Sequence, residues 1–254
     1  MNRSKRASLA KETLEIIERG YYINSSGNKI EIAGSLKAAI EGTRLYSPKD
    51  FPNNIAGVDP ETEETKIELS PETTLAAAQR LALLSSESNL LCLNFASAKN
   101  PGGGFLSGSQ AQEESLARSS GLYPCLMSKG EMYDHNRQLE TCLYSDYMIY
   151  SPRVPVFRDD EGNLLDQPFQ ASFITSPAVN AGAIQRNESK KIDLIRPTML
   201  RRLHRILWVA LENNQTRLVL GAWGCGIFGN DPTMIAEIFA EALNQNSPFY
   251  NRFK

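Results

Sequence analysis

Hydrophobic and polar positions in the first third of the chain follow helical and strand periods in turn. Residues from about Ser4 to Arg19 place apolar side chains at the spacing of an amphipathic helix, and Gly20 would end it. Two short apolar runs within 21–32, separated by a Ser-Ser-Gly-Asn turn, predict a β-hairpin. The segment 47–68 is rich in Pro, Asp, Asn and Glu, which is typical of a surface loop.

Strands and helices alternate from residue 70 onward. Ser70 followed by Pro71 is typical of a helix start, because serine can cap the first turn and proline lacks the N–H that would be unpaired there. Leu90–Leu93 is a continuous apolar run that fits a strand covered on both faces. Further strands are predicted over 147–150, 172–175 and 217–220, a hairpin over 154–165, and helices over 198–212 and 233–243. This alternation predicts one layered α/β domain.

Composition and charge narrow the classes of partner. Of the 254 residues, 41% are hydrophobic and 22% are charged, so the chain can bury a substantial core. The formal net charge of −2 offers no broad basic surface for duplex nucleic acid. No apolar run is long enough to cross a bilayer, and the basic N-terminus lacks the apolar stretch of a signal peptide. We therefore expect a cytoplasmic protein without membrane attachment.

The cysteines and histidines form no metal-binding pattern. The four cysteines lie far apart without a C-x-x-C pair, so we expect reduced thiols in the core. The two histidines, His135 and His204, are far apart in the sequence and have no H-E-x-x-H pattern around them. The sequence predicts no metal site.

Three loops that follow predicted strands contain the candidate chemistry. The first, 94–104, ends in three consecutive glycines (102–104), the second is 176–183, and the third is 221–232. In an open α/β sheet, ligands bind in the crevice outside the carboxyl ends of the strands. We therefore expect the three loops to meet at one cleft.

The third loop has the composition of a phosphate-binding loop. Four glycines within 221–229 allow successive backbone N–H groups to point inward beside a helix start at Asp231 and Pro232, which suits a phosphate or diphosphate. Residues 224–229 also match the dinucleotide-binding pattern G-x-G-x-x-G. Only 25 residues follow Gly229, however, which are too few for the rest of a Rossmann unit. A plain tight turn is the structural alternative.

Two adjacent acids follow the first loop. Ser109 and Gln112 match the S-x-x-Q capping box, which would place Glu113 and Glu114 in the first turn of a helix. Adjacent helical side chains diverge by about 100°, so we expect the carboxylates to have separate tasks, one holding a ligand and one reacting. Burial would raise the pKa of a glutamate there, as a general acid requires, whereas the helix dipole would lower it. Alternatively, both acids only stabilise the helix start.

Two further features have structural interpretations. Arg201, Arg202 and Arg205 fall on a predicted helix, where a solvated basic face is favoured over a polymer-binding patch. Trp223 lies inside the third loop, where it either stacks on a base or anchors the loop in the core.

These residues together resemble the signature of poly(ADP-ribose) glycohydrolases of the bacterial type, which are built on a macrodomain. The resemblance is found in the following segments, in the family's order: Gly42–Tyr46, Asn94–Ala98, Pro101–Gly104, Gln112–Glu114, Ile149–Pro152, Val154–Asp159, Ser176–Asn180 and Gly221–Asp231. It implies a three-layer α/β/α macrodomain with a mixed central sheet and an N-terminal accessory extension. Residues 1–70 would form the accessory region, packed on a catalytic core of residues 71–254 in a single globular unit.

The resemblance also implies an activity and a set of site residues. The activity is hydrolysis of ribose–ribose O-glycosidic bonds in poly(ADP-ribose), with release of ADP-ribose and without a metal or organic cofactor. Glu114 would be the catalytic acid and base, and Glu113 would bond the hydroxyls of the same ribose. The implied substrate-binding residues are Asn100, Gly102, Gly103, Gly104, Gln112, Val179, Asn180, Gly224, Cys225, Gly226, Ile227, Phe228 and Gly229.

The first and third loops would then bind different parts of the ligand. The glycines 102–104 would close around the reacting ribose, with Asn100 nearby, and residues 224–229 would hold the diphosphate. Phe228 would pack on the distal ribose, with a plain core aromatic as the alternative.

Two other functions stay open. One is a hydrolase that removes single ADP-ribose units from modified protein or nucleic acid, and the other is a non-catalytic ADP-ribose-binding macrodomain. The acids Glu113 and Glu114 argue against the second, because recognition needs the phosphate loop but no acid at the bond to be broken. They do not separate the two hydrolases.

Overall fold

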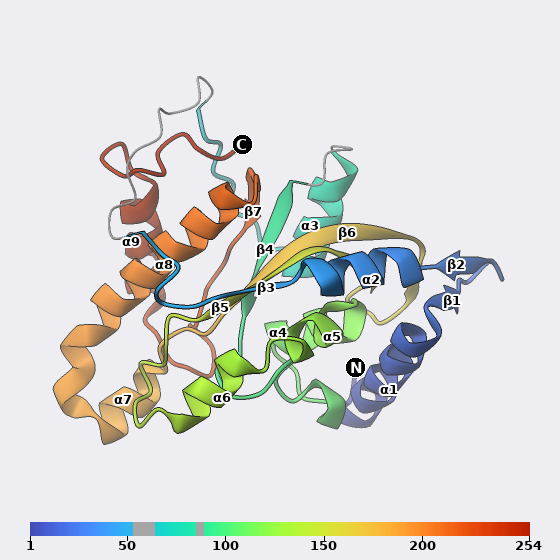
Figure 1. Cartoon of the computed structure of the whole chain (residues 1–254), viewed down its shortest axis with the longest axis horizontal. Helices are drawn as coiled ribbons and strands as arrows, with labels where there is room; N and C mark the ends of the chain where they lie inside the picture. Colours follow the sequence, from blue (N-terminus) through green and yellow to red (C-terminus); the bar gives the residue numbers. More distant parts are fainter. Residues whose placement is uncertain (53–63, 85–88) are drawn as a thin grey trace.

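The computed structural model describes residues 1–52, 64–84 and 89–254 (Figure 1). In chain order the elements are α1 (Arg3–Arg19), β1 (Tyr21–Ile23), β2 (Lys29–Glu31), α2 (Ala33–Gly42), β3 (Arg44–Tyr46), α3 (Thr74–Leu83), β4 (Leu90–Phe95), η1 (Phe105–Ser107), α4 (Gln112–Ser119), α5 (Leu122–Met127), α6 (Glu131–Gln138), β5 (Met148–Arg158), β6 (Leu164–Ser176), α7 (Ala181–Asn187), η2 (Ser189–Leu194), α8 (Ile195–Glu212), β7 (Arg217–Val219) and α9 (Pro232–Leu243).

The centre of the fold is a mixed sheet. Within the described ranges its five strands have the order β3-β5-β6-β4-β7. β4 pairs parallel with β6 and β7, whereas β5 pairs antiparallel with β3 and β6. β4 is buried from Leu90 to Asn94, as its apolar run predicts. β5 and β6 form one long hairpin, so the strands predicted over 147–150 and 172–175 and the hairpin predicted over 154–165 belong to the same two strands.

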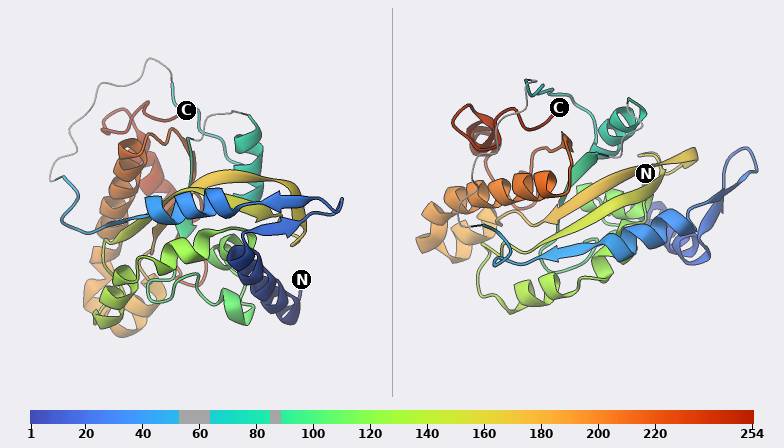
Figure 2. Two further views of the ribbon diagram at one scale, coloured as in Figure 1. Left: turned by 45° about the vertical axis from the view of Figure 1, so that its right-hand side comes forward. Right: turned by 45° about the horizontal axis from the view of Figure 1, so that its top comes forward.

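Helices cover both faces of this sheet (Figure 2). Successive side chains of a strand point to opposite faces, and β4 follows this rule. Leu91 and Leu93 pack in one cluster with residues of α8 and α9, whereas Leu90 and Cys92 pack in a second cluster with residues of α3, α4 and α5. The predicted three-layer α/β/α architecture with a mixed central sheet is confirmed.

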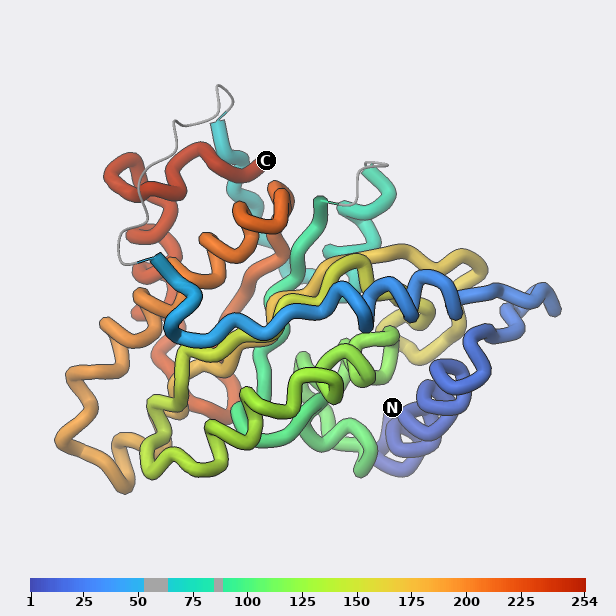
Figure 3. The backbone as a smooth tube through the Cα atoms, viewed as in Figure 1, coloured from blue at the N-terminus to red at the C-terminus, as the bar shows by residue number. Residues whose placement is uncertain are grey.

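The N-terminal elements lie at one end of the molecule (Figures 1 and 3). α1 ends at Gly20, which has φ 77°, and β1 pairs with β2, as predicted. The Thr13 hydroxyl of α1 donates to the Arg118 carbonyl of α4 at 2.5 Å. β3, in contrast, pairs with β5 at the edge of the sheet, so residues 44–46 contribute directly to the core. The division of the chain at residue 70 stays a prediction.

Two predicted helix starts are wrong. α3 begins after Thr73, whose hydroxyl accepts from the Ala76 N–H at 3.1 Å, and not at Ser70, whose hydroxyl bonds Glu72 instead. The Ser109 capping box does not form either. The cap of α4 is Ala111, whose methyl group cannot accept a hydrogen bond, and the Gln112 amide bonds β4 instead of the helix end. The predicted cap at Asp231, by contrast, is confirmed.

The sequence patterns did not predict every element. α2, β3, α5, α6 and α7 were not expected, and the surface loop predicted over 47–68 falls partly outside the described residues. Among the described helices, none is long and apolar enough to cross a membrane.

Candidate active site

Three loops meet at one edge of the sheet. β4, β6 and β7 run parallel, so their carboxyl ends lie side by side and the chain leaves each of them at the same edge. The second and third loops are bonded to each other: the Gly182 N–H donates to the Phe228 carbonyl at 2.9 Å, and the Trp223 indole N–H donates to the Ser176 carbonyl at 3.1 Å. The loops therefore leave the sheet at one edge, as predicted, whereas a cleft shared by all three stays a prediction.

The glycine loop after β4 is folded against the two acids. Gly102 and Gly103 have φ of 68° and 58°, in the left-handed region that favours glycine. A Cβ atom on Gly103 would clash with Oε1 of Glu114 and would lie 3.2 Å from Oε2 of Glu113. Gly103 therefore allows the backbone to lie directly on both carboxylates.

Glu113 is a buried acid with defined donors. Its side chain lies at the first turn of α4, and the residue is only 3% exposed. Oε2 accepts from the Ser97 N–H at 2.6 Å and Oε1 from the Asn94 amide at 3.3 Å. Burial raises the pKa of Glu113 to about 8, although the donors lower it, and the nearby charge of Glu114 raises it further. For this residue, burial therefore outweighs the hydrogen bonds that favour the ionised carboxylate.

Glu114 is half-buried and has different partners. Its Oε1 accepts from the Gly104 N–H at 3.0 Å, and Oε2 forms no hydrogen bond to any described residue. The two acids thus have the separate partners that their helical divergence predicts. They nevertheless converge on Gly103, which the divergence alone does not predict. This arrangement leaves one carboxylate oxygen of Glu114 available beside a glycine backbone.

Gln112 joins α4 to β4. Its Oε1 accepts from the Phe95 N–H at 2.8 Å, and its Nε2 donates to the Leu93 carbonyl at 2.7 Å and to the Thr74 hydroxyl at 3.1 Å. Both amide donors are therefore used inside the protein. A direct contact between Gln112 and a ligand stays a prediction.

The third loop presents free backbone donors. Gly224 and Gly229 have φ of 77° and 65°, and the Gly229 N–H closes a turn on the Gly226 carbonyl at 3.0 Å. The preceding residues of this turn are Gly226, Ile227 and Phe228. Their backbone N–H groups form no hydrogen bond to any described residue, and Ile227 is 89% exposed. Successive backbone N–H groups without internal partners can bind an anion without a basic side chain.

The other predicted residues take supporting or peripheral positions. Val179 is fully buried, with its N–H on the Met199 sulfur and its carbonyl on the Asn230 amide at 2.7 Å. Asn180 caps α7 by accepting from the Ala183 N–H at 3.0 Å. Asn100 is exposed and bonds Gly103 through its carbonyl. Cys225, in the third loop, is a partly buried free cysteine. Trp223 is 1% exposed, so it anchors the third loop rather than presenting a stacking face.

Sequence reasoning assigned no role to several residues that shape the site. Asn94 and Ser97 hold Glu113, and a polar Asn94 within an otherwise apolar strand was a signal that could have shown this. Tyr144 has no such signal, although its ring centroid lies 5.9 Å from that of Phe228.

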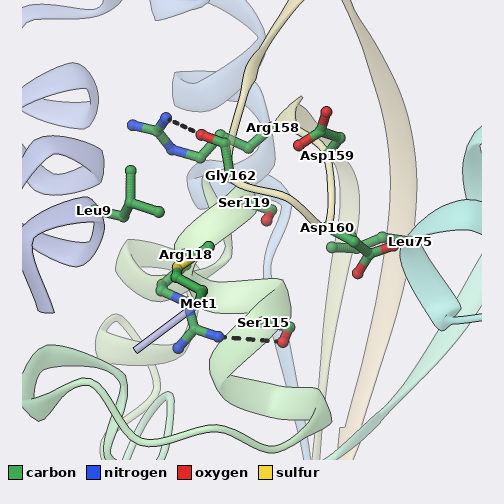
Figure 4. A pocket seen from close by; sticks show the side chains of 10 residues that line it. All are labelled: Met1, Leu9, Leu75, Ser115, Arg118, Ser119, Arg158, Asp159, Asp160 and Gly162. Carbon is green, nitrogen blue, oxygen red and sulfur yellow. Dashed lines mark hydrogen bonds between the residues drawn. The ribbon is translucent and has the colours of Figure 1, made fainter. Parts of the chain in front are cut away.

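A separate small cavity lies between α1, α4 and the β5–β6 turn (Figure 4). Arg118 donates to the Ser115 hydroxyl at 3.2 Å, and Arg158 donates to the Gly162 carbonyl at 2.9 Å. Arg158 also pairs with Glu12 of α1 at 2.9 Å. None of the predicted site residues lines this cavity, which belongs to the packing of α1 on the core.

Fold and site together define a macrodomain-like protein with an acid pair beside a phosphate-type loop. A model of the microbial-type poly(ADP-ribose) glycohydrolase (PARG) catalytic domain matches residues 10–159. The PARG structure from Thermomonospora curvata is 47% identical, with a TM-score of 0.93 over 99% of this chain and 91% of that chain. Its complex with the inhibitor ADP-HPD gives the same identity and coverage, with a TM-score of 0.92.

A second bacterial relative is more distant in structure. The PARG from Deinococcus radiodurans in complex with ADP-ribose is 46% identical, with a TM-score of 0.78 over 86% of this chain and 87% of that chain. A comparison with curated proteins found no match. The chain therefore belongs to the microbial-type PARG family, and the family resemblance predicted from the sequence is confirmed.

Because the Gly103 backbone lies against the Glu114 carboxyl, a methyl group added at residue 103 should destabilise the protein more than one added at an uncrowded glycine. Gly103→Ala adds a left-handed alanine and a clash with Glu114, so we expect a loss of about 3 kcal/mol in the free energy of unfolding. Gly27→Ala is the matched control, because Gly27 has φ 79° with no atom within 4 Å, and should lose about 1 kcal/mol. Urea unfolding measures both. Adding Glu114→Ala should restore part of the Gly103→Ala loss, and equal losses for the two alanines would contradict the clash.

The raised pKa of Glu113 predicts a pH-dependent stability. The folded protein holds this proton up to about pH 8, whereas an unperturbed glutamate releases it near 4.5. The unfolded state therefore binds fewer protons between these values, and this contribution to stability is lost as the pH rises from 4.5 through 8. Glu113→Gln should become more stable relative to wild type over this range, by on the order of a few kcal/mol. Urea unfolding at pH 5, 6.5 and 8 measures the difference, and a pH-independent difference would contradict the assignment.

Proposed function

We propose that this protein hydrolyses ribose–ribose O-glycosidic bonds in poly(ADP-ribose) and releases ADP-ribose, with Glu114 as general acid and base. Membership of the microbial-type PARG family supports the reaction, as do the relatives solved with ADP-ribose and with the inhibitor ADP-HPD. The observation that favours Glu114 is its free Oε2 beside the glycine loop, since Oε1 alone is used by the Gly104 N–H.

The reaction needs one proton donor that later accepts a proton. In the first step the Glu114 carboxyl gives its proton to the leaving ribose oxygen, the bond from that oxygen to the anomeric carbon breaks, and positive charge develops on the remaining ribose. In the second step a water attacks the anomeric carbon and gives a proton to the Glu114 carboxylate. Glu114 is thereby returned to its starting state, and one water is consumed for each bond cleaved.

Glu113 has a holding role in this proposal. The Ser97 N–H and the Asn94 amide fix its carboxyl, so it presents a constant position to the ribose hydroxyls. Because its pKa is raised to about 8, Glu113 keeps its proton near neutral pH and can donate as well as accept a hydrogen bond. A neutral Glu113 also places less negative charge beside Glu114.

The third loop would bind the diphosphate. The unpaired N–H groups of 226–228 would donate to its oxygens, and Phe228, which is partly buried, would pack on the distal ribose. The glycines 102–104 would close around the reacting ribose near Asn100. Direct ligand contacts by Gln112, Val179, Asn180 and Cys225 belong to the same proposal.

Two simpler observations support a cytoplasmic location and the expected lack of nucleic-acid and membrane partners. The four cysteines are free, which favours the reducing cytoplasm. The near-neutral charge favours neither duplex nucleic acid nor an anionic membrane surface.

The central test compares wild type with Glu114→Gln, which keeps the shape of the side chain but cannot transfer the proton. Wild type should release free ADP-ribose from poly(ADP-ribose), and the variant should lose about three orders of magnitude in kcat. Its affinity for ADP-ribose, measured by calorimetry, should stay within about threefold of wild type, since binding rests on the backbone donors of 226–228. Glu161→Gln, at the exposed β5–β6 turn, is the control.

The substrates of this assay separate the functions. Mono-ADP-ribosylated protein and DNA are tested beside the polymer. Cleavage of only these two by wild type would replace the proposal by a mono-ADP-ribosyl hydrolase, and binding without any cleavage would indicate a reader. Full activity of Glu114→Gln on the polymer would remove Glu114 from its role.

A further inference from the structure

The loop before β5 contains a strained tyrosine next to the candidate site. Tyr144 has φ 58°, a left-handed conformation that a bulky residue rarely adopts. Its ring lies 5.9 Å from that of Phe228, at an angle of 43°. Burial raises the pKa of Tyr144, and the adjacent Asn180 amide partly offsets this rise. Residues held in unfavourable backbone conformations concentrate where a site needs a fixed geometry.

A buried arginine of α8 holds this loop. Arg202 is fully buried, and its guanidinium donates to the carbonyls of Leu143 at 3.0 Å and Tyr144 at 3.3 Å. A further donor bonds the Pro177 carbonyl at 2.8 Å, which lies in the loop after β6. One side chain therefore joins the strained loop to a loop of the candidate site.

The charge of Arg202 is balanced by Asp146. The two groups bond at 2.9 Å, and Asp146 also pairs with Arg201 and Arg205. Although burial raises the pKa of Asp146, the three guanidinium groups hold it below its usual range. The solvated basic face predicted for these arginines is therefore wrong for Arg202, which has no exposed side-chain surface, whereas the Arg201 side chain is 51% exposed. A pair buried in this way fixes the backbone that it bonds.

Phe228 stands on a glycine-rich loop and packs, partly buried, against the core cluster that includes side chains of α8 and α9. It lies between Gly226 and Gly229, and an added Cβ on Gly226 would meet no atom within 4 Å. Its carbonyl bonds the Gly182 N–H, but its own N–H has no partner among the described residues. The Tyr144 ring supplies a lateral contact to an aromatic side chain that stands on a glycine-rich loop.

We propose that Tyr144 is a positioning residue: held in its left-handed conformation by Arg202, it fixes the ring of Phe228 for the ribose of an ADP-ribose ligand. This inference rests on the proposed function for its ligand. Tyr144 acts through Phe228 and does not itself transfer a proton.

Two substitutions at Tyr144 distinguish the contribution of the aromatic ring from that of the left-handed backbone conformation. Tyr144→Gly removes the ring and relieves the left-handed strain, whereas Tyr144→Ala removes the ring and keeps the strain. We expect both to weaken ADP-ribose binding about tenfold by calorimetry, while Tyr144→Ala lowers the melting temperature more. Tyr144→Phe should restore most of the affinity. Asn214→Gly relieves a similar φ of 54° at an exposed turn and should leave binding unchanged.

Two outcomes would overturn the inference. Wild-type affinity in both Tyr144→Gly and Tyr144→Ala would show that the ring positions nothing. An affinity loss that follows the melting temperature, larger for alanine than for glycine, would show a merely structural role.

A double-mutant cycle tests the route through Phe228. Phe228→Ala combined with Tyr144→Gly should bind ADP-ribose no more weakly than Phe228→Ala alone, within about twofold, because the tyrosine then has nothing to position. Losses that simply multiply would overturn the inference. None of these readouts needs hydrolysis, so a protein that binds ADP-ribose without hydrolysing the polymer would contradict the proposed function and still test Tyr144. A wild type that does not bind ADP-ribose would overturn both.

Discussion

The Glu113 carboxyl is bonded to the end of β4 and to the loop that follows it, in a place where burial raises its pKa to about 8. An acid without these donors would cost far more to bury. The same constraint explains its neighbours: Gln112 uses its amide on β4, and Gly103 must lack a Cβ for the loop to lie on the carboxylates. Strand, loop and helix therefore form one unit that places Glu114.

A second unit holds the other half of the site. The loops after β6 and β7 bond each other through Phe228 and Trp223, and the Arg202–Asp146 pair ties them to the loop that contains Tyr144. In the proposed function, the two units would contact different parts of the ligand, the reacting ribose and the diphosphate. The parallel pairing of β4 with β6 and β7 sets the distance between them, so the sheet is the frame that holds the acids and the proposed diphosphate loop at one edge.

Sequence patterns predicted those features that depend on local chemistry. Gly20 and Asp231 end and begin helices because their own backbone and side chain satisfy the termini, and the glycines of the two loops mark where the backbone must turn. Prediction failed where contacts between residues far apart in the sequence determine the position of a side chain. Ser109 matched a capping box, but the Gln112 amide is used on β4, and Arg202 has a helical surface spacing but pairs with Asp146, 56 residues away. The left-handed Tyr144 has no local signal at all.

A crystal structure of Glu114→Gln with a short poly(ADP-ribose) chain would show directly whether residue 114 lies at the bond to be cleaved. We predict that its side chain lies within hydrogen-bond reach of the linking glycosidic oxygen, about 2.6 to 3.2 Å. We also predict that the neighbouring diphosphate lies on the N–H groups of 226–228. A glycosidic oxygen beyond the reach of residue 114 and any bridging water, or a diphosphate bound elsewhere, would contradict the proposed site.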